Sequence, residues 1–197
     1  REVAPEFVFT NVSDSAALRA VVEGEGGLAV ALSAGATVVD NSSVSPEAAR
    51  EVATVLARRG IEFLDAPVTG GTTGAEAGKL TVMVGGERTV FERAEPLLRA
   101  FATSIYFIGP VGSGQACKLC NQVTAACAML GLCEGLALAV KSGLPVRTGL
   151  DVLSSGSAGS TIVRVQGAKI LAGDMTAGFR VDLMRKDLRT AHEFAGA

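Results

Sequence analysis

The sequence predicts an α/β domain followed by an all-helical domain. In the first half, short β-type runs alternate with helical patterns, an order that is typical of a sheet with parallel members covered by helices. The second half has no convincing strand after Gly109, and residues 113–142 form one long helical pattern, about 45 Å at the standard rise per residue. We therefore expect the α/β domain at residues 1–109 and the helical domain at residues 110–197.

The individual elements follow from local signals. Ser13 and Asp14 can cap a helix, and Ser45-Pro46-Glu47 is a strong helix start whose helix ends at Gly60. Strands are expected at residues 7–11, 37–41, 62–66, 80–84 and 104–108, and helices at residues 14–23, 46–59, 87–100, 113–142, 145–154, 160–172 and 183–195.

Composition and charge exclude several classes of function. The formal net charge is −2, aromatic residues make up 5% of the chain and there is no Trp. A basic field and a base-stacking surface are therefore both missing, which argues against nucleic-acid binding. The longest apolar stretch, from Val123 to Cys133, is shorter than the roughly 20 residues of a membrane span. We expect it to be a buried helix and expect no membrane contact.

The four cysteines all lie within the long helical stretch, at positions 117, 120, 127 and 133. Cysteines on one helix do not easily meet disulfide geometry. Cys117 and Cys120 form a CxxC, but there is no second such pair and His192 is the only histidine. We therefore expect buried reduced thiols, no metal site and a reducing compartment, the cytoplasm.

A glycine run, Gly109-x-x-Gly112-x-Gly114, follows a predicted strand and opens the long helix. It departs from a dinucleotide fingerprint because Cys117 stands where the third glycine belongs. It also departs from a Walker A loop, since Gln115 occupies the place of the lysine. The pattern favours a flexible domain junction and helix start over a phosphate site.

Lys118 lies in an unusually apolar part of this helix. Desolvation disfavours the charged form of a lysine, so its pKa should be lowered into a range that suits proton transfer. Asn121 and Gln122 follow at helical spacing and share its face. From spacing alone, a lysine that extends to solvent beside two surface amides is an equally valid interpretation.

Two further motifs have a functional and an ordinary interpretation. Thr69, Gly70 and Gly71 follow the third predicted strand, and a hydroxyl beside paired glycines allows backbone N–H groups to approach a carboxylate. The same residues also suit an ordinary glycine-rich turn. Lys186 opens the last helix, where it can reach a ligand or remain solvated.

Four segments taken together resemble the β-hydroxyacid dehydrogenase family. They occur in the family's order and separation, and the match covers essentially the whole chain. The resemblance implies a Rossmann-type domain joined by a long helix to a helical domain, NAD or NADP as cofactor, and interconversion of a short 3-hydroxy acid and its aldehyde. The segments are VVDNSSVSP (Val38–Pro46), DAPVTGGTTGAEAGKLTVMVGG (Asp65–Gly86), GPVGSGQACKLCNQ (Gly109–Gln122) and GFRVDLMRKDLRTA (Gly178–Ala191).

The resemblance assigns the catalytic and substrate-binding positions. Lys118 is implied to transfer the proton. The family more often has Ser at the position of Thr69, and the Asn-Gln pair resembles the tartronate semialdehyde reductases, so 2-hydroxy-3-oxopropionate is the expected substrate. The implied substrate-binding residues are Thr69, Gly70, Gly71, Asn121 and Gln122.

The resemblance also assigns cofactor contacts, namely Val12, Ser13, Ser43 and Lys186. Val12-Ser13 stands where the family has Leu-Pro. The family begins with a GxGxMG fingerprint that residues 1–11 do not match. We therefore expect an N-terminally truncated chain that holds the second half of the Rossmann domain and lacks a C-terminal tail. Such a fragment alone should be inactive and should bind the cofactor poorly, and the choice between NAD and NADP stays open.

The sequence also leaves alternatives open, both within this family and outside it. 3-Hydroxyisobutyrate dehydrogenase and glyoxylate or succinic semialdehyde reductase share the same reaction class. A decarboxylating relative that acts on 6-phosphogluconate calls for a His-Asn pair after the lysine, which Asn121-Gln122 does not supply. A noncatalytic binding module would be marked by loss of the lysine, and Lys118 is present. The expected partners are a small-molecule substrate and a second copy of the chain, bound through the helical domain.

Overall fold

The computed structural model describes residues 4–196, and its internal contacts divide the chain into two compact units. One unit, called the α/β unit below, comprises Arg1–Cys120 together with Gly178–Ala197. The other, the helical unit, is Asn121–Ala177. The last helix therefore belongs to the α/β unit, although it follows the helical unit in the sequence.

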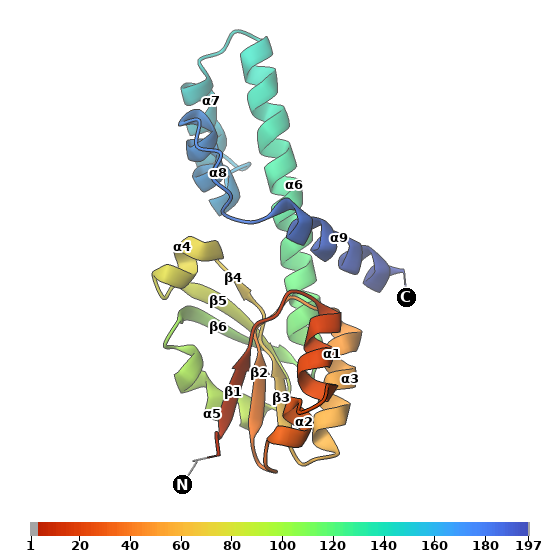
Figure 1. The fold of residues 1–197 in the computed structure, drawn as a ribbon. Helices are drawn as coiled ribbons and strands as arrows, with labels where there is room; N and C mark the ends of the chain where they lie inside the picture. Colours follow the sequence, from red (N-terminus) through yellow and green to blue (C-terminus); the bar gives the residue numbers. More distant parts are fainter. Residues whose placement is uncertain (1–3, 197) are drawn as a thin grey trace. The chain divides into compact units, whose positions relative to one another are not determined.

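The α/β unit is built on a six-stranded sheet (Figure 1). The strand order is β1-β2-β3-β5-β4, and β6 pairs with β5. Strands β1, β2 and β3 are parallel to one another, as are β5 and β6, whereas β5 is antiparallel to β3 and β4. The strands are β1 (Phe7–Thr10), β2 (Thr37–Asp40), β3 (Glu62–Asp65), β4 (Val68–Thr69), β5 (Leu80–Gly85) and β6 (Ala102–Gly109).

Strands β3 and β4 form one extended segment along β5. Asp65 pairs with Gly85, Val68 with Val82, and Thr69 with Thr81, so the register is continuous. Thr69 therefore lies four residues beyond the end of β3 in the same direction, about 13 Å at the rise of a strand. This extension places Thr69 beyond the carboxyl ends of the parallel strands.

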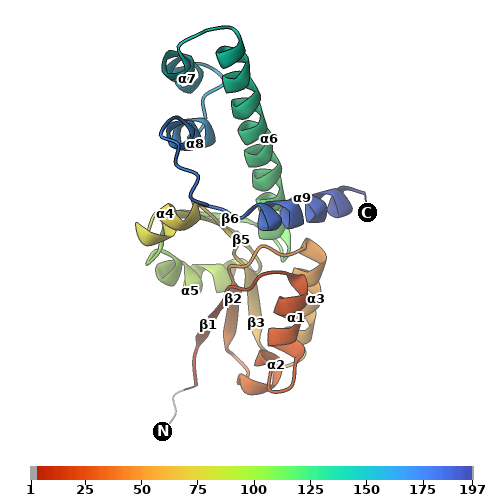
Figure 2. The same ribbon diagram turned by 45° about the horizontal axis from the view of Figure 1, so that its top comes forward.

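Helices cover both faces of this sheet (Figures 1 and 2). On one face α1 (Ser15–Glu23), α2 (Leu28–Ala31) and α3 (Pro46–Ala57) contribute to one core, and on the other face α5 (Arg88–Leu98) packs into a second. Successive side chains of a strand point to opposite faces of the sheet, so each strand contributes to both cores. Val38 of β2, for example, lies in the first core and Val39 in the second. Strands that are buried on both faces explain the continuous apolar runs in the sequence.

The first turn of α6 (Ser113–Lys141) packs closely against the ends of β3 and β5. A Cβ atom on Gly114 would lie 2.4 Å from the carbonyl oxygen of Met83, and one on Gly85 would lie 2.4 Å from Oδ1 of Asp65. Only glycine permits such an approach. Gly112, just before the helix, has a φ of +90°, which also favours glycine. The helix start is as expected, and the glycine run before it is closely packed within the α/β unit.

The helical unit contains most of α6 together with α7 (Val146–Ser155) and α8 (Thr161–Leu171). Leu132 and Leu136 of α6 form a small core with Leu150 of α7 and Val163 of α8. Gly167 is needed in α8 because a Cβ atom there would lie 2.3 Å from a methyl carbon of Leu150. The unit is held by this one cluster on one side of α6.

The predicted fold class is confirmed, and most helices and strands occur where expected within one to three residues. The short elements α2, β4 and α4 (Gly71–Glu76) were not predicted. The last helix, α9 (Val181–Ala195), begins two residues before the expected start. Brief elements of two to six residues lack the periodicity on which the predictions depend.

The prediction that the apolar stretch of α6 is buried is wrong, and so is the prediction of buried thiols. Within Val123–Cys133, Val123 and Leu130 are 42% and 62% exposed. Three of the four cysteines are exposed and Cys117 is half-buried. The reason is that α6 is apolar around its whole circumference, while the helical unit covers only one side of it.

Among the described residues, α6 is also the one helix that is long and apolar enough to cross a membrane. The most apolar 18 residues of α6 have a mean hydropathy of 1.9, and 17% of these residues are buried. Length and composition alone do not distinguish a membrane span from a helix that packs against protein.

Candidate active site

Polar residues gather at the carboxyl ends of the parallel strands. Thr10, Asp40 and Asp65 end β1, β2 and β3, and all three side chains are buried. Oγ1 of Thr10 donates a 2.8 Å hydrogen bond to Oδ1 of Asp40. The carboxyl edge of parallel strands is where α/β proteins bind their ligands, so this edge is the natural place for a site.

The loop between β2 and α3 is fixed to this edge by Ser42. Its hydroxyl donates to Oδ1 of Asp40 at 2.6 Å and accepts from the backbone N–H of Val12 at 2.7 Å. Ser42 is buried, whereas its neighbour Ser43 is half-buried. The loop after β1, which contains Val12 and Ser13, is thereby joined to the loop that contains Ser43.

Lys186 of α9 joins the same two loops. Its Nζ donates to the carbonyl oxygens of Ser13 at 3.0 Å and Ser43 at 2.5 Å, and it forms an ion pair with Oδ1 of Asp187 at 3.1 Å. All four expected cofactor positions, Val12 included, therefore lie in one connected cluster. The cluster lies at the edge of the sheet where α/β proteins bind their ligands, and its assignment to the cofactor stays a prediction.

A shallow hollow of about 390 Å³ on α9 lies beside this cluster. Its lining residues are Asp182, Arg185, Lys186 and Arg189. Three cations against one carboxylate give this surface a positive balance, which suits an anionic group. Arg185 and Arg189 were not singled out from the sequence.

Lys118 lies in the second turn of α6 and is 7% exposed. Burial lowers the pKa of Lys118 to about 8, the nearby charge of Asp187 opposes this shift and the charge of Lys186 adds to it. A lysine in this range can both give and accept a proton near neutral pH. The expectation of a desolvated lysine is confirmed, and Lys118 belongs to the same unit as the strand-end cluster.

Asn121 and Gln122 follow Lys118 on the same helix but fall within the helical unit. Gln122 is buried and accepts a 2.9 Å hydrogen bond from Nδ2 of Asn121 to its Oε1. The two amides thus orient each other. Their assignment to substrate binding stays a prediction.

Thr69, Gly70 and Gly71 lie where β4 meets α4. Thr69 is half-buried at the end of β4, and both glycines are exposed. Gly70 and Gly71 have φ values of +134° and +65°, which favour glycine at both positions. The segment is therefore a strand end and helix start rather than a simple turn, and its role in holding a carboxylate stays a prediction.

The sequence interpretation missed two buried groups that connect these parts. Asp65, at the end of β3, accepts hydrogen bonds from the backbone N–H groups of Gly112 and Gln115, each 2.8 Å long. Its carboxylate therefore caps the start of α6. Gln115 is fully buried, and its amide bonds to the loop around Ser43. A signal was present: an acid ends the third strand, and Gly112, which directly precedes the helix, has no side chain that could cap it.

Burial dominates the electrostatics of the two strand-end acids. It raises the pKa of Asp65 to about 6, against the lowering effect of the two N–H bonds, and the charge of Asp40 adds to the rise. Burial also raises the pKa of Asp40. Oδ2 of Asp40 is the one fully buried side-chain oxygen or nitrogen atom in residues 4–196 that has no hydrogen-bond partner.

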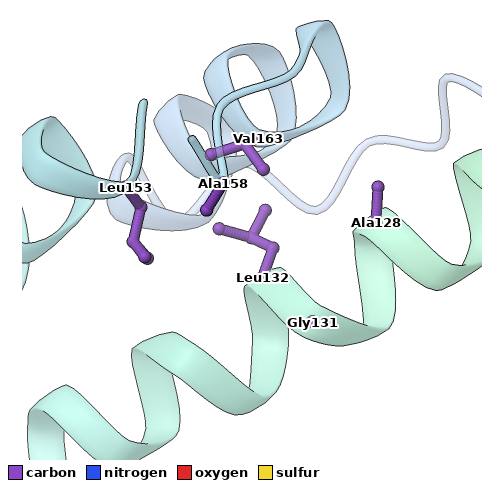
Figure 3. A pocket seen from close by; sticks show the side chains of 6 residues that line it. All are labelled: Ala128, Gly131, Leu132, Leu153, Ala158 and Val163. Carbon is purple, nitrogen blue, oxygen red and sulfur yellow. The ribbon is translucent and has the colours of Figure 1, made fainter. Parts of the chain in front are cut away.

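The helical unit has a pocket of a different kind (Figure 3). It measures about 200 Å³ and is lined by Ala128, Gly131, Leu132, Leu153, Ala158 and Val163. None of these side chains can titrate or form a hydrogen bond, so the pocket offers no group for proton transfer. Within residues 4–196, no group of three or more His, Cys, Asp and Glu side chains could hold a metal ion.

Fold and site together define a Rossmann-type nucleotide-binding protein with a buried lysine on its connecting helix. Residues 1–109 match the NAD binding domain of 6-phosphogluconate dehydrogenase. Residues 112–197 match the domain described as NAD-binding of NADP-dependent 3-hydroxyisobutyrate dehydrogenase. The chain belongs to the β-hydroxyacid dehydrogenase family, as its sequence motifs imply. The expected NAD or NADP cofactor is confirmed at the level of this family.

Individual relatives match nearly all of the chain. The 2-(hydroxymethyl)glutarate dehydrogenase of Eubacterium barkeri is 41% identical over 96% of this chain and 64% of the relative. The 2-hydroxy-3-oxopropionate reductase of Escherichia coli (strain K12) is 38% identical over 98% of this chain and 66% of the relative. The structure of Mycobacterium tuberculosis 3-hydroxyisobutyrate dehydrogenase with L-serine has a TM-score of 0.87 at 31% identity, over 98% of this chain and 68% of that one. The chain thus spans about two thirds of the length of these relatives.

Proposed function

We propose that the protein that carries this chain is an NAD(P)-dependent oxidoreductase that interconverts a short 3-hydroxy acid and its semialdehyde. The observation that carries this proposal is the buried Lys118, whose pKa is lowered to about 8, in the same unit as the cluster of Ser13, Ser43 and Lys186. The cluster would hold the nicotinamide end of the cofactor. A noncatalytic module would have no need to keep an ionisable lysine in a buried position, since desolvation makes it costly.

The chain's residues have distinct roles in the proposed reaction. When bound, the cofactor supplies or accepts the hydride. During reduction, Nζ of Lys118 donates a proton to the substrate oxygen as the carbonyl becomes a hydroxyl. During oxidation, the neutral amine accepts that proton. Thr69, Gly70 and Gly71 hold the substrate carboxylate, and Asn121 or Gln122 orients the hydroxyl or carbonyl group.

The substrates in the relatives' names share one chemical unit. 2-(Hydroxymethyl)glutarate, 3-hydroxyisobutyrate and L-serine each contain HO–CH2–CH(R)–COO⁻, and 2-hydroxy-3-oxopropionate is the aldehyde form with R = OH. The carboxylate and the reacting carbon are constant, and only R differs. We propose this unit as the substrate class of the present protein, with R = OH preferred because Asn121 and Gln122 offer amides to an extra hydroxyl.

The substrate preference can be measured with a matched pair of compounds. Glycerate and 3-hydroxyisobutyrate differ only in whether R is a hydroxyl or a methyl group. We expect kcat/KM for oxidation to be about 5-fold higher with glycerate, since one hydrogen bond contributes about 1 kcal/mol. The natural gene product that carries this sequence would be assayed with NAD and NADP.

The same assay tests the proposed function itself. 2-(Hydroxymethyl)glutarate and L-serine complete the panel, and 4-hydroxybutyrate, whose hydroxyl lies one carbon further from the carboxylate, is the control. A higher efficiency with 3-hydroxyisobutyrate would reverse the assigned preference. Absence of activity with every HO–CH2–CH(R)–COO⁻ compound would remove the proposed function.

Replacement of Thr69 by valine should weaken substrate binding. The change keeps the shape of the side chain but removes the hydroxyl proposed to face the carboxylate, a bond to a charged group worth about 1.5–3 kcal/mol. KM for the hydroxy acid should therefore rise by about 10-fold or more while the melting temperature changes little. Thr72→Val is the control, because Thr72 is an exposed threonine in the adjacent α4. Equal KM values for Thr69→Val and the wild type would argue against the assignment.

The exposed surface of α6 bears on the partners of the protein. We propose a cytoplasmic protein without nucleic-acid or membrane partners, in which the exposed apolar side of α6, with Leu130, Leu138 and Val140, packs against a second copy. Contiguous exposed apolar surface of this kind is typical of protein interfaces.

A further inference from the structure

The side chain of Gln115 links the helix of Lys118 to the loop of Ser43. Gln115 is the third residue of α6 and is fully buried. Its Nε2 donates to the carbonyl oxygen of Ser42 at 2.8 Å, and its Oε1 accepts from the backbone N–H of Val44 at 3.1 Å. The amide thus binds the peptide groups on both sides of Ser43. Lys118 follows three residues later on the same face of the helix.

These two contacts select glutamine specifically. One atom must donate to a carbonyl group and the other must accept from an N–H group, and an amide does both. Glutamate has the right length but would place a carboxylate oxygen against the carbonyl of Ser42. Asparagine is one methylene too short, and methionine fills the volume without either hydrogen bond. The amide therefore recognises the loop backbone as well as filling space.

The other hydrogen bonds of Ser42–Val44 also involve side chains. The hydroxyl of Ser42 is bonded to Asp40 and Val12, and the carbonyl of Ser43 accepts from Lys186. The loop lies between β2 and α3, outside the regular hydrogen bonds of either. Its position is consequently set by the groups that bind it, and Gln115 is the one among them that belongs to α6.

The α6 end of the link is itself fixed. The backbone N–H of Gln115 donates to Oδ2 of Asp65, which ends β3. The close approach of Gly114 to Met83 leaves the first turn little freedom to shift. A displacement of the loop relative to the helix therefore requires the side-chain bonds of Gln115 to break.

We propose that Gln115 is a positioning residue for the reaction: its amide sets the Ser42–Val44 loop, and with it the cofactor-contacting Ser43, in register with the helix that carries Lys118. The proposal rests on the proposed function, because it takes Ser43 as a cofactor contact and Lys118 as the proton-transfer group. Gln115 touches neither substrate nor cofactor in this scheme. It acts through the loop.

The test compares Gln115→Met and Gln115→Glu with the wild type in the natural gene product that carries this sequence. A shift of about 1 Å in a reacting group can cost about 10²-fold in rate, so kcat/KM for the cofactor should fall on this order. The dissociation constants for NADH and NADPH, measured by fluorescence titration, should rise. Amide hydrogen exchange at Val44, measured without cofactor, should become faster in Gln115→Met because its acceptor is lost.

Thr37→Val is the matched control. Thr37 is also fully buried, its hydroxyl donates to Glu62 and accepts from Arg93, and it begins β2 at the end opposite Asp40. Its replacement removes two part-buried side-chain hydrogen bonds and should lower the melting temperature. Cofactor affinity and kcat/KM should then remain within about twofold of the wild type.

The outcomes separate this inference from the proposed function. If the Gln115 variants keep the cofactor affinity and the kcat of the wild type at an equal folded fraction, the positioning role is overturned and the proposed function stands. If the wild type turns over no substrate of the panel, the proposed function fails, and the dissociation constants of the variants still decide the role of Gln115. If the wild type binds neither NADH nor NADPH, both are overturned.

Discussion

Replacement of Lys118 by alanine is expected to lower kcat by about 10²–10⁴-fold, the usual contribution of a positioned general acid or base. Cofactor affinity should change little, because Ser13, Ser43 and Lys186 remain in place. Turnover would be measured by steady-state kinetics in the natural gene product and affinity by titration with NADH. Lys141→Ala is the control, since Lys141 is an exposed lysine at the end of the same helix. A Lys118→Ala enzyme with more than about half the wild-type rate would exclude the assigned role.

The pH dependence gives a second signature of the same residue. Because burial lowers the pKa of Lys118 to about 8, the protonated donor is lost as the pH rises through 8. The rate of reduction should therefore fall through this range, whereas the rate of oxidation, which needs the neutral amine, should rise. Lys118→Arg keeps the positive charge but cannot release a proton near neutral pH. The change in rate around pH 8 should therefore be absent in this variant. If the change in rate around pH 8 persists in Lys118→Arg, it arises from the titration of another group.

The burial of Lys118 could be predicted from sequence because the relevant signal is local, whereas its catalytic role was implied only by the family resemblance. An ionisable residue within an apolar helical run predicts desolvation wherever the helix packs, and the structure buries Lys118 as expected. The helix and strand periods likewise depend on neighbouring residues, and the glycine and capping signals at Gly60 and Ser45 mark real helix ends. Local signals of this kind account for most of the fold.

The groups that connect the candidate site could not be predicted in this way. Asp65 binds Gly112, 47 residues away, and Gln115 binds Ser42, 73 residues away. Neither contact leaves a periodic trace in the sequence. In the sequence, Gln115 is notable only because it occupies the place of the lysine of a Walker A loop. Nothing in the pattern indicates that its amide binds the backbone on both sides of Ser43. Pairing across such distances depends on the sheet order, which spacing alone does not reveal.

The error over α6 has a related cause. The apolar composition of residues 123–133 predicts that they avoid water, but it does not say which surface covers them. In the helical unit Leu132 is buried against α7 and α8, whereas Leu130, on another side of the helix, is largely exposed. Hydrophobicity identifies a helix that needs partners. It does not identify the partner.

Asp65 should make the folded protein less stable as the pH rises, contrary to the usual behaviour of a carboxylate. Burial raises its pKa from 3.8 to about 6, so the folded state holds this proton more tightly than the unfolded state does. The corresponding stability is fully present below pH 3.8 and is lost as the pH rises through 6. A shift of about 2 pKa units corresponds to a loss of about 3 kcal/mol in the free energy of unfolding.

Asp65→Asn separates this charge effect from the capping role. At pH 4 the variant should be less stable than the wild type by about 1–3 kcal/mol, because the amide offers one acceptor oxygen and leaves the N–H of Gly112 or Gln115 without its partner. Toward pH 7 the wild type loses the free energy that ionisation costs, while the variant does not. Between pH 4 and pH 7 the free energy of unfolding of the wild type should therefore fall by about 2–3 kcal/mol relative to that of the variant, so that the two stability curves meet or cross. Urea denaturation of the chain at several pH values would follow both curves.

Asp14→Asn is the control for this series. Asp14 caps α1, and its pKa is lowered chiefly by the hydrogen bond from the backbone N–H of Ala17. Its contribution is therefore lost only below its ordinary pKa of 3.8, so its variant and the wild type should stay parallel from about pH 5 to 7. If the curves for Asp65→Asn also stay parallel between pH 4 and 7, the carboxylate is already ionised at pH 4. In that case the start of α6 stabilises the charge of Asp65 by more than burial destabilises it.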